Sequence, residues 1–549
     1  MSTLKPKLFS VMKTYSKEQF IKDVIAGIIV AIIALPLSIA LAIASGVSPE
    51  QGLYTAIVAG FVIAFLGGSR VQVSGPTAAF ATIVAGIVAT KGMSGLVVAT
   101  IMAGIILIIM GLCKLGTLIK FIPYTITTGF TAGIAVTILI GQIKDFLGLS
   151  VVSEEPLVET MDKLIYDIKF IHTINCEALA VGAVSLVILI VWPMIKRPAF
   201  ISKIPPSLIA VIAGIFMVKL LKMNVNTIGD LYTIKAGVPK FALPEFSFSM
   251  IRDLLPNAFT IAVLAAIESL LSCVVSDSMV NSRHNSNMEL VAQGAGNIAS
   301  ALFGGIPATG AIARTAANVK NGGRTPIAAM VHAGMLLLIM VVLMPYAALI
   351  PMPTIAAILF MVAYNMSGWR SFVKQCKTAP VSDIIVLVVT FVLTVVFDLV
   401  VAIEVGMIIT CVLFIKRMSE ETLVKGWKII DDENDPDSIS LRKVPADTMV
   451  YEISGPMFFG AADKILSISV HEEMKNLILR MRSVNAIDST AINALKTLAD
   501  SCKQKNVRLI LSHVNEQPLN ALKKCGLYDE VGADNFCEHI DAALERAEK

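Results

Sequence analysis

Charged residues are scarce in this sequence. Asp, Glu, Lys and Arg account for only 16% of its 549 residues, while 56% are apolar. A soluble domain carries roughly 25% charged residues, so the composition excludes a protein that is soluble throughout. The formal net charge is only +4, and so small an excess argues against nucleic acid as a partner.

Motifs of disulfide, metal and catalytic sites are also missing. The eight cysteines never form a CxxC pair. This argues against a disulfide framework and against a zinc site, and it fits a reducing compartment for the C-terminal part. No Ser/His/Asp arrangement and no Gly-rich phosphate loop stands out. We therefore predict no enzymatic activity, no cofactor and no bound metal.

Long apolar runs dominate residues 24–416 instead. A helix needs about 20 residues to cross the bilayer core of about 30 Å, and the hydropathy pattern predicts fourteen apolar segments. The third and tenth are too short to cross the core alone. In chain order, the predicted segments are 24–45, 51–67, 76–90, 93–112, 118–147, 178–195, 206–221, 256–280, 289–303, 310–320, 325–345, 354–367, 381–397 and 400–415.

Basic residues mark one side of this predicted membrane domain. The loops after even-numbered segments contain Lys and Arg, and the short loops after odd-numbered segments contain almost none beyond Lys91. By the positive-inside rule, both termini face the cytosol. Residues 1–23 carry five lysines and no cleavage site, so they are predicted to form a cytosolic lead-in helix and not a signal peptide.

The two halves of the membrane domain resemble each other at an offset of 237 residues. Residues 52–68, "GLYTAIVAGFVIAFLGG", then fall on residues 289–305, "ELVAQGAGNIASALFGG", and their GG pairs coincide. The offset also aligns the two short segments and places Thr77 on Arg314. Because each half holds seven segments, the second copy is inverted across the membrane. Paired short segments broken by Gly or Pro indicate a transporter binding site.

Two half-helices that start near the middle of a membrane form an anion site by themselves. Their first N–H groups lack partners, and each helix dipole places about half a positive charge at that end. Pro76 suits a first-turn helix position, and Arg314 lies about one turn inside the second half-helix. The predicted anion-binding residues are Gly75, Pro76, Thr77, Ala78, Gly310, Ala311, Ile312, Ala313 and Arg314.

Arg314 has two interpretations. An arginine at the centre of a bilayer costs at least about 2.5–3.5 kcal/mol, so a partner or a water-filled cavity is expected beside it. In the functional interpretation, which we favour, its guanidinium binds the transported anion. In the structural interpretation, it forms an ion pair that joins helices.

Glu268 is a second charge deep in an apolar segment. A lone carboxylate there either pairs with a cation or becomes protonated. If Glu268 and Arg314 line one cavity, protonation of the carboxylate favours anion binding and couples the anion to protons. The alternative is a fixed Glu268–Arg314 pair. The sequence leaves open whether Asp398, Glu404 and His332 take part in transport.

Residues 440–549 show short apolar runs that alternate with amphipathic helices, which predicts a small α/β domain after a linker at 417–439. Asp488, Ser489 and Thr490 open one of its helices. These three residues form either a helix cap alone or a regulatory site that holds a phosphate or is phosphorylated. The expected strands are 448–460, 476–481 and 507–514, and the expected helices are 462–474, 489–505, 515–526 and 535–549.

The stretches "DVIAGIIVAIIALPLSIALAIASGVSPEQGLYTAIVAG" and "GGSRVQVSGPTAAFA" resemble the SulP anion permeases, and the tail with "IDSTA" resembles the STAS domain that follows their membrane part. The resemblance implies a polytopic α-helical membrane protein with fourteen spans in two inverted seven-span repeats. A core bundle of segments 1–4 and 8–11 moves against a gate bundle of segments 5–7 and 12–14. A cytosolic α/β STAS domain follows the membrane part. It also implies a homodimer in a bacterial inner membrane, with lipid around it and a cytosolic protein or a nucleotide as the STAS ligand.

Within that family, "AAIESLLSCVV", "GGIPATGAIARTAANV" and "DFLGLS" are most similar to the DauA-type C4-dicarboxylate permeases. This resemblance favours proton-coupled uptake of succinate or fumarate by alternating access, with sulfate or bicarbonate as the alternative anion. The chain has Leu37, Thr77 and Ala313 where family members with chloride sites often have polar or aromatic side chains. A more apolar lining suits an anion with a hydrocarbon middle.

Three other functions fit the same residues. An uncoupled anion channel would use the same fold without Glu268 as a proton carrier. A permease for neutral uracil- or xanthine-like bases would not need Arg314. A sensor would use the tail for signalling and the membrane part as an anchor.

Overall fold

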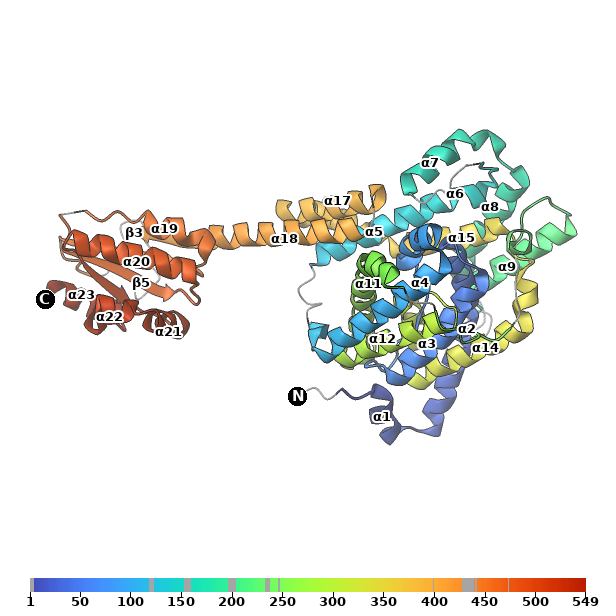
Figure 1. Cartoon of the computed structure of the whole chain (residues 1–549), viewed down its shortest axis with the longest axis horizontal. Helices are drawn as coiled ribbons and strands as arrows, with labels where there is room; N and C mark the ends of the chain where they lie inside the picture. Colours follow the sequence, from blue (N-terminus) through green and yellow to red (C-terminus); the bar gives the residue numbers. More distant parts are fainter. Residues whose placement is uncertain are drawn as a thin grey trace. The chain divides into compact units, whose positions relative to one another are not determined.

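The structure is a computed structural model of the whole chain. It divides into two compact units, Met1–Met407 and Ile408–Lys549 (Figure 1), and each is described by itself. The structure describes all residues except 1–3, 118–122, 153–158, 196–203, 233–236, 245–246, 398, 427–438, 440–441 and 472.

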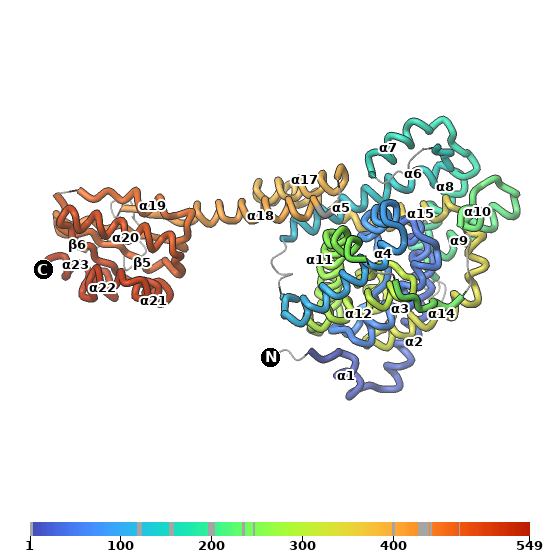
Figure 2. The backbone as a smooth tube through the Cα atoms, viewed as in Figure 1, coloured from blue at the N-terminus to red at the C-terminus, as the bar shows by residue number. Residues whose placement is uncertain are grey.

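Helices form nearly all of the first unit (Figure 2). The last helix, α18, continues from the first unit into the second. The helices are α1 (Lys7–Val11), α2 (Lys17–Ala44), α3 (Pro49–Leu66), α4 (Ala81–Leu112), α5 (Tyr124–Gly141), α6 (Ile143–Leu147), α7 (Thr160–Lys169), α8 (Cys176–Val191), α9 (Pro206–Leu220), α10 (Ile228–Leu231), α11 (Phe248–Val280), α12 (Ser286–Leu302), α13 (Ile312–Lys320), α14 (Pro326–Ala347), α15 (Met352–Met366), α16 (Trp369–Thr378), α17 (Val381–Val396) and α18 (Leu399–Glu421).

Each apolar segment predicted from the sequence coincides, at least in part, with one of these helices. Among the described residues, eight helices are long and apolar enough to cross a membrane, and α9 and α17 are apolar but shorter. The helical membrane architecture is therefore as expected. The number of fourteen crossings stays a prediction, because several of these helices are shorter than a full crossing.

One local prediction is wrong. Residues 1–23 do not form one lead-in helix, because α1 and a 3₁₀ turn at Met12–Thr14 end before Ser16, which caps α2 with a hydrogen bond from the Gln19 N–H.

The predicted break between the third and fourth segments is confirmed. α4 consists of two helical stretches joined by a kink at Gly92, which adopts φ 68°, a conformation that favours glycine.

Glycine also lets the helices of the first unit approach closely. α4 packs against α12 at Gly104 and Gly294, and a Cβ on Gly104 would lie 2.7 Å from the Gly294 carbonyl oxygen. α2 packs against α14 at Gly27, where a Cβ would lie 2.6 Å from the Ala328 carbonyl oxygen. Small residues at helix crossings are typical of membrane bundles, because backbone packing there replaces the hydrophobic effect.

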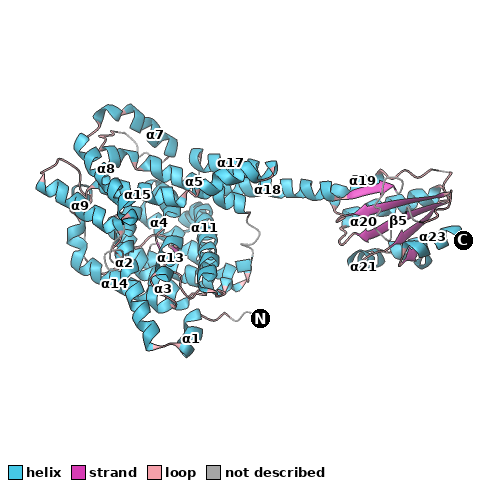
Figure 3. Cartoon of the chain, turned by 180° about the vertical axis from the view of Figure 1, so that it is seen from behind, coloured by secondary structure: helices cyan, strands magenta, loops and turns pink. Residues whose placement is uncertain are grey.

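The second unit contains a five-stranded sheet in the order β3-β4-β5-β6-β7 (Figure 3). β3 is antiparallel to β4, and the remaining neighbours are parallel. The strands are β3 (Leu423–Gly426), β4 (Thr448–Ser454), β5 (Asn476–Ser483), β6 (Arg508–Ser512) and β7 (Phe536–Cys537), and the helices are α19 (Ala462–Leu466), α20 (Ser489–Gln504), α21 (Glu516–Lys524), α22 (Leu527–Val531) and α23 (Ile540–Glu548).

The sheet has an apolar core on each face. Along β5, Leu477 and Leu479 join the core that contains α20 and α21, while Ile478 joins the core that contains α23. This alternation is the period-two pattern of a strand buried on both faces. The α/β domain predicted for the tail is thus present, with helices on both sides of the sheet.

Several element boundaries in the tail differ from the prediction. Strand β3 lies in the stretch predicted to be a linker, and β4 ends at Ser454 instead of reaching residue 460. The helix expected at 462–474 is only α19, five residues long. Residues Phe536–Cys537 pair with β6 as β7, so the last helix begins later than expected. The acidic stretch 431–438 lies outside the described residues.

Candidate functional site

Two short strands bring the halves of the membrane domain together. β1 (Ser74–Gly75) pairs antiparallel with β2 (Thr309–Gly310), so that Ser74 faces Gly310 and Gly75 faces Thr309. The Ala311 N–H extends the ladder with a 2.9 Å hydrogen bond to the Val73 carbonyl oxygen. Segments separated by more than 230 residues of chain therefore meet directly before the two predicted half-helices begin.

The half-helices that follow these strands have no side-chain cap. α13 begins at Ile312 with Ala311 as its N-cap residue, and the 3₁₀ turn Ala78–Phe80 that leads into α4 has Thr77 as its N-cap residue. Neither N-cap side chain accepts a hydrogen bond from its helix. The first N–H groups are thus left for another acceptor, which is the property that makes helix N-termini bind anions. Pro76 precedes the helical turn and does not occupy its first position, contrary to the prediction.

Arg314 lies in the first turn of α13 with only 1% of its surface exposed. Its Nη2 donates to the carbonyl oxygen of Pro76 at 3.2 Å and to Oγ of Ser38 at 3.3 Å. Within the described residues, its Nε and Nη1 atoms have no hydrogen-bond partner and no carboxylate pairs with it. A buried guanidinium without a counter-charge is energetically costly.

Glu268 on α11 accepts a hydrogen bond from the Thr77 hydroxyl, with 3.0 Å between Oγ1 and Oε2. The part of the chain that the structure describes contains no ion pair between Glu268 and Arg314. The two charges instead contact neighbouring residues, because Arg314 binds Pro76 and Glu268 binds Thr77. A fixed Glu268–Arg314 pair, the structural interpretation considered from the sequence, is therefore not present.

The start of α13 is accessible although Arg314 is buried. Ile312 is 45% exposed and Ala313 is exposed, while Gly310 and Arg314 on either side are covered. Thr77 and Glu268 are half-buried. The two predicted anion-binding segments therefore lie together, with Arg314 buried and its neighbours Ile312 and Ala313 exposed.

Sequence reasoning missed Ser38, which holds Arg314 from α2. Its only signal in the sequence is a small polar residue within an apolar segment. Among the other charged candidates, His332 on α14 is fully buried, and neither of its ring nitrogens has a hydrogen-bond partner among the residues described; Glu404 is exposed. Asp398 lies outside the described residues. The described residues contain no group of three His, Cys, Asp or Glu side chains that fits a metal ion.

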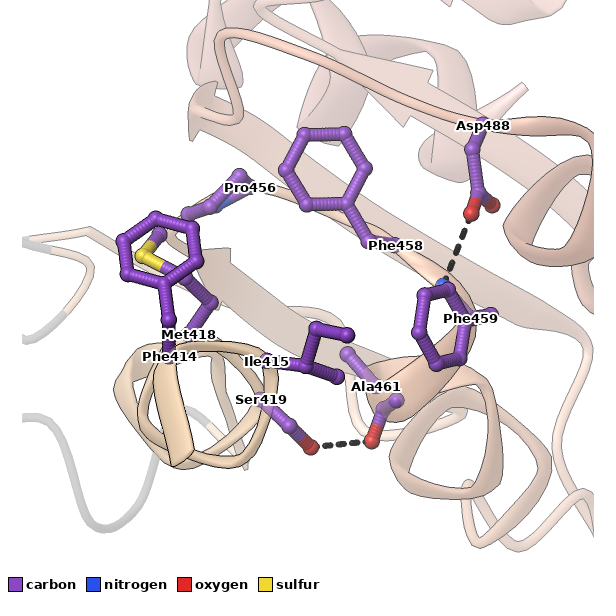
Figure 4. A pocket seen from close by; sticks show the side chains of 10 residues that line it. Phe414, Ile415, Met418, Ser419, Pro456, Phe458, Phe459, Ala461 and Asp488 are labelled. Carbon is purple, nitrogen blue, oxygen red and sulfur yellow. Dashed lines mark hydrogen bonds between the residues drawn. The ribbon is translucent and has the colours of Figure 1, made fainter. Parts of the chain in front are cut away.

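The candidate regulatory residues lie at the start of α20 in the second unit. The Asp488 carboxylate accepts from the N–H of Ala491 at 2.9 Å and from the N–H of Phe459 at 2.8 Å, so it caps the helix. Ser489 and Thr490 are exposed. Asp488 also borders a mostly apolar pocket of about 200 Å³ between Phe414 and Met418 of α18 and the loop with Pro456, Phe458 and Phe459 (Figure 4).

Residues 20–390 match the model of the sulfate permease family, and residues 439–543 match the model of the STAS domain. The chain belongs to the sulfate permease family. Members of this family are anion transporters, so the chain is a multi-pass membrane transporter with a C-terminal STAS domain.

Similar proteins in this family carry different names. The putative sulfate transporter YvdB of Bacillus subtilis (strain 168) is 41% identical over 535 residues, which cover 96% of this chain and 98% of YvdB. The bicarbonate transporter BicA of Picosynechococcus sp. (strain ATCC 27264 / PCC 7002 / PR-6) is 30% identical over 545 residues, which cover 96% of this chain and 94% of BicA.

Two solved structures have a similar fold. Murine Slc26a9, described as an anion transporter, matches with a TM-score of 0.87 at 19% identity over 99% of this chain and 94% of that chain. The transmembrane domain of BicA from a cyanobacterium matches with a TM-score of 0.63 at 30% identity, over 71% of this chain and 98% of that domain. At so low an identity, the Slc26a9 match concerns the fold alone.

Proposed function

We propose that this chain is a proton-coupled anion symporter that works by alternating access. The observation that carries the proposal is Arg314, which is buried and, in the part of the chain that the structure describes, has no carboxylate partner and two nitrogen atoms without hydrogen bonds. Two uncapped helix starts lie beside it. An anion between these ends satisfies the guanidinium and the free N–H groups together.

Glu268 is the proposed proton carrier. Its carboxylate binds Thr77, and Thr77 is the N-cap residue of the turn that leads into α4. A negative charge at that place opposes the binding of a second negative charge, and protonation removes the opposition. Proton uptake at Glu268 and anion binding at Arg314 therefore favour each other, which is the thermodynamic basis of symport.

C4-dicarboxylates such as succinate and fumarate are the proposed substrates. Nε and Nη1 of the guanidinium each have N–H donors that can bind a carboxylate oxygen. Leu37, Ala78 and Ala313 adjoin Ser38, Thr77 and Arg314 in the sequence, and their apolar side chains suit a hydrocarbon middle. The names of YvdB and BicA make sulfate and bicarbonate the alternatives.

The remaining proposals concern the cellular arrangement. We place the protein in a bacterial inner membrane as a homodimer, with the N-terminus and the STAS domain in the cytosol. Asp488, Ser489 and Thr490 are the proposed regulatory site, where the exposed hydroxyls at the start of α20 take a phosphate or a cytosolic partner.

Uptake by purified protein in liposomes tests the proposed function. Labelled fumarate, sulfate and bicarbonate are offered separately, with and without an inward proton gradient. We expect fumarate uptake that the gradient accelerates. Gradient-driven uptake of sulfate or bicarbonate alone would reassign the substrate, and uptake that ignores the gradient would support the uncoupled channel.

A further inference from the structure

A second buried carboxylate lies close to the proposed anion site, on α12. Glu289 is 0% exposed. Its Oε2 accepts from the backbone N–H groups of Gly68 at 2.9 Å and Ser69 at 3.2 Å. Its Oε1 accepts from the side-chain amides of Gln72 and Gln293, each at 2.9 Å. The carboxylate is thus surrounded by N–H donors.

The neighbouring side chains fix the orientation of these donors. Gln72 uses the same amide nitrogen to donate to Ser269 of α11 at 3.0 Å, and its oxygen accepts from the Cys273 thiol at 2.9 Å. The Ser269 hydroxyl also donates to Glu289 at 3.4 Å. Every hydrogen bond to the Glu289 carboxylate therefore comes from a neutral donor, an arrangement suited to holding backbone in place and not to binding a cation.

The segment that Glu289 holds is the one that leads into β1. Gly68, Ser69 and Gln72 all precede Ser74–Gly75, and Gln293 donates to the Ser74 hydroxyl at 3.3 Å in addition. β2 contacts the same network, because a Cβ on Gly310 would collide with the side-chain amide of Gln72. One carboxylate thus determines the position of both strands through the residues next to them.

We propose that Glu289 is a positioning residue for anion binding. It holds the β1 segment so that Pro76 and Thr77 stay in contact with Arg314 and Glu268, and so that the amides after Thr77 face the anion. The inference rests on the anion site proposed above, and it adds a residue that contacts neither the anion nor the proton.

The variant Glu289→Gln tests this role. It keeps the shape of the side chain but turns an amide N–H₂ toward N–H donors, which breaks at least one hydrogen bond to a charged acceptor. Because a hydrogen bond to a charged acceptor is lost, we expect the KM for fumarate to rise about 10-fold or more. The acceleration of uptake by a proton gradient is expected to remain, because Glu268 is unchanged.

Asp23→Asn is the matched control. Asp23 is also 0% exposed, and it accepts from the Gln19 side chain, the Tyr15 and Thr325 hydroxyls and the Arg324 N–H. These partners lie outside both strands. We expect a lower melting temperature from Asp23→Asn without a change in KM. The double variant Glu289→Gln/Gln72→Glu, which exchanges the amide and the carboxylate, is expected to bring the KM back toward wild type.

Backbone hydrogen exchange gives a readout that does not depend on transport. Glu289→Gln is expected to accelerate exchange in peptides that cover residues 68–80, and Asp23→Asn is not. If Glu289→Gln does not fold, Gln293→Met removes one donor from the network and is expected to show smaller effects of the same kind. Unchanged KM and unchanged exchange at 68–80 in a folded variant would overturn the positioning role. Absence of anion uptake by the wild type would instead overturn the proposed function.

Discussion

The Thr77 hydroxyl donates a hydrogen bond to the carboxylate of Glu268 across 3.0 Å. This bond joins α11 to the residue that begins the first half-helix. The next residue toward the N-terminus, Pro76, accepts a hydrogen bond from Arg314 of the second half-helix. Two adjacent residues thus connect the candidate proton carrier to the candidate anion-binding cation, and this arrangement gives rise to the predictions that follow.

Replacement of Glu268 by Gln is expected to uncouple anion uptake from protons. The amide imitates a protonated carboxylate in shape and charge and still accepts a hydrogen bond from Thr77. Fumarate flux through liposomes that contain Glu268→Gln should therefore be the same with and without a pH gradient. Glu404→Gln, at an exposed glutamate of α18, is the control and should keep the gradient dependence. Full gradient dependence in Glu268→Gln would assign the proton to another group.

Replacement of Arg314 by Lys is expected to weaken anion binding even though the charge is retained. A lysine has no planar fork and cannot bind two carboxylate oxygens in the same way. With about 1.5–3 kcal/mol lost, the dissociation constant should rise about 10- to 100-fold. Isothermal titration with fumarate measures this change. An unchanged affinity would show that the planar guanidinium does not bind the anion.

Replacement of Gly75 by Ala is expected to displace Arg314. A Cβ on Gly75 would collide with Nη1 of Arg314, whereas a Cβ on Gly334 of α14 meets no atom within 4 Å. Gly75→Ala should therefore abolish saturable uptake, while Gly334→Ala should leave it intact and stabilise α14 slightly, by up to about 1 kcal/mol. Normal uptake by Gly75→Ala would show that the site tolerates a displaced guanidinium.

Replacement of Asp488 by Ala is expected to destabilise the second unit. The loss of a helix N-cap costs about 0.5–2 kcal/mol, and Asp488 also holds the Phe459 N–H. The variant should expose the 439–549 region to limited proteolysis at a lower temperature than the wild type. Ser489→Ala, which alters an exposed neighbour, should leave the cleavage temperature unchanged.

Cys502 should resist alkylation in the folded protein. It lies on α20 with its side chain in the core, only 1% exposed, and burial raises the pKa of its thiol to about 11. Only the thiolate reacts, so modification by iodoacetamide at pH 8 should be slow and should accelerate as the pH rises toward 11. Cys176 is exposed and serves as the reference in peptide mass spectrometry. Equal rates at both sites would contradict the packing of the second unit.

Much of the architecture could be predicted from the sequence, because long apolar runs have few structural solutions in a membrane. The close approach of residues 74–78 and 309–314 could also be predicted, since the internal repeat aligns the two short segments. The boundaries in the tail were harder to predict. β7 has only two residues, and its pairing with β6 determines it more than its own composition does.

The residues that hold Arg314 and the β1 segment in place could not be predicted, for a different reason. Ser38 and Glu289 are single polar residues in helical segments, and nothing local distinguishes a residue that holds Arg314 or the β1 segment from one that faces water. Their roles come from partners as many as 276 residues away in the chain. Such roles become visible only when the tertiary contacts are known.

The most direct test of the anion site is the location of a bound anion with an anomalous scatterer. Crystals of the protein grown with 2-bromosuccinate, and in parallel with selenate, are measured at the bromine and selenium absorption edges. We expect an anomalous peak beside Nε or Nη1 of Arg314, between the first turns that follow Thr77 and Ala311. A peak elsewhere, with Arg314 still bound only to Pro76 and Ser38, would contradict the account.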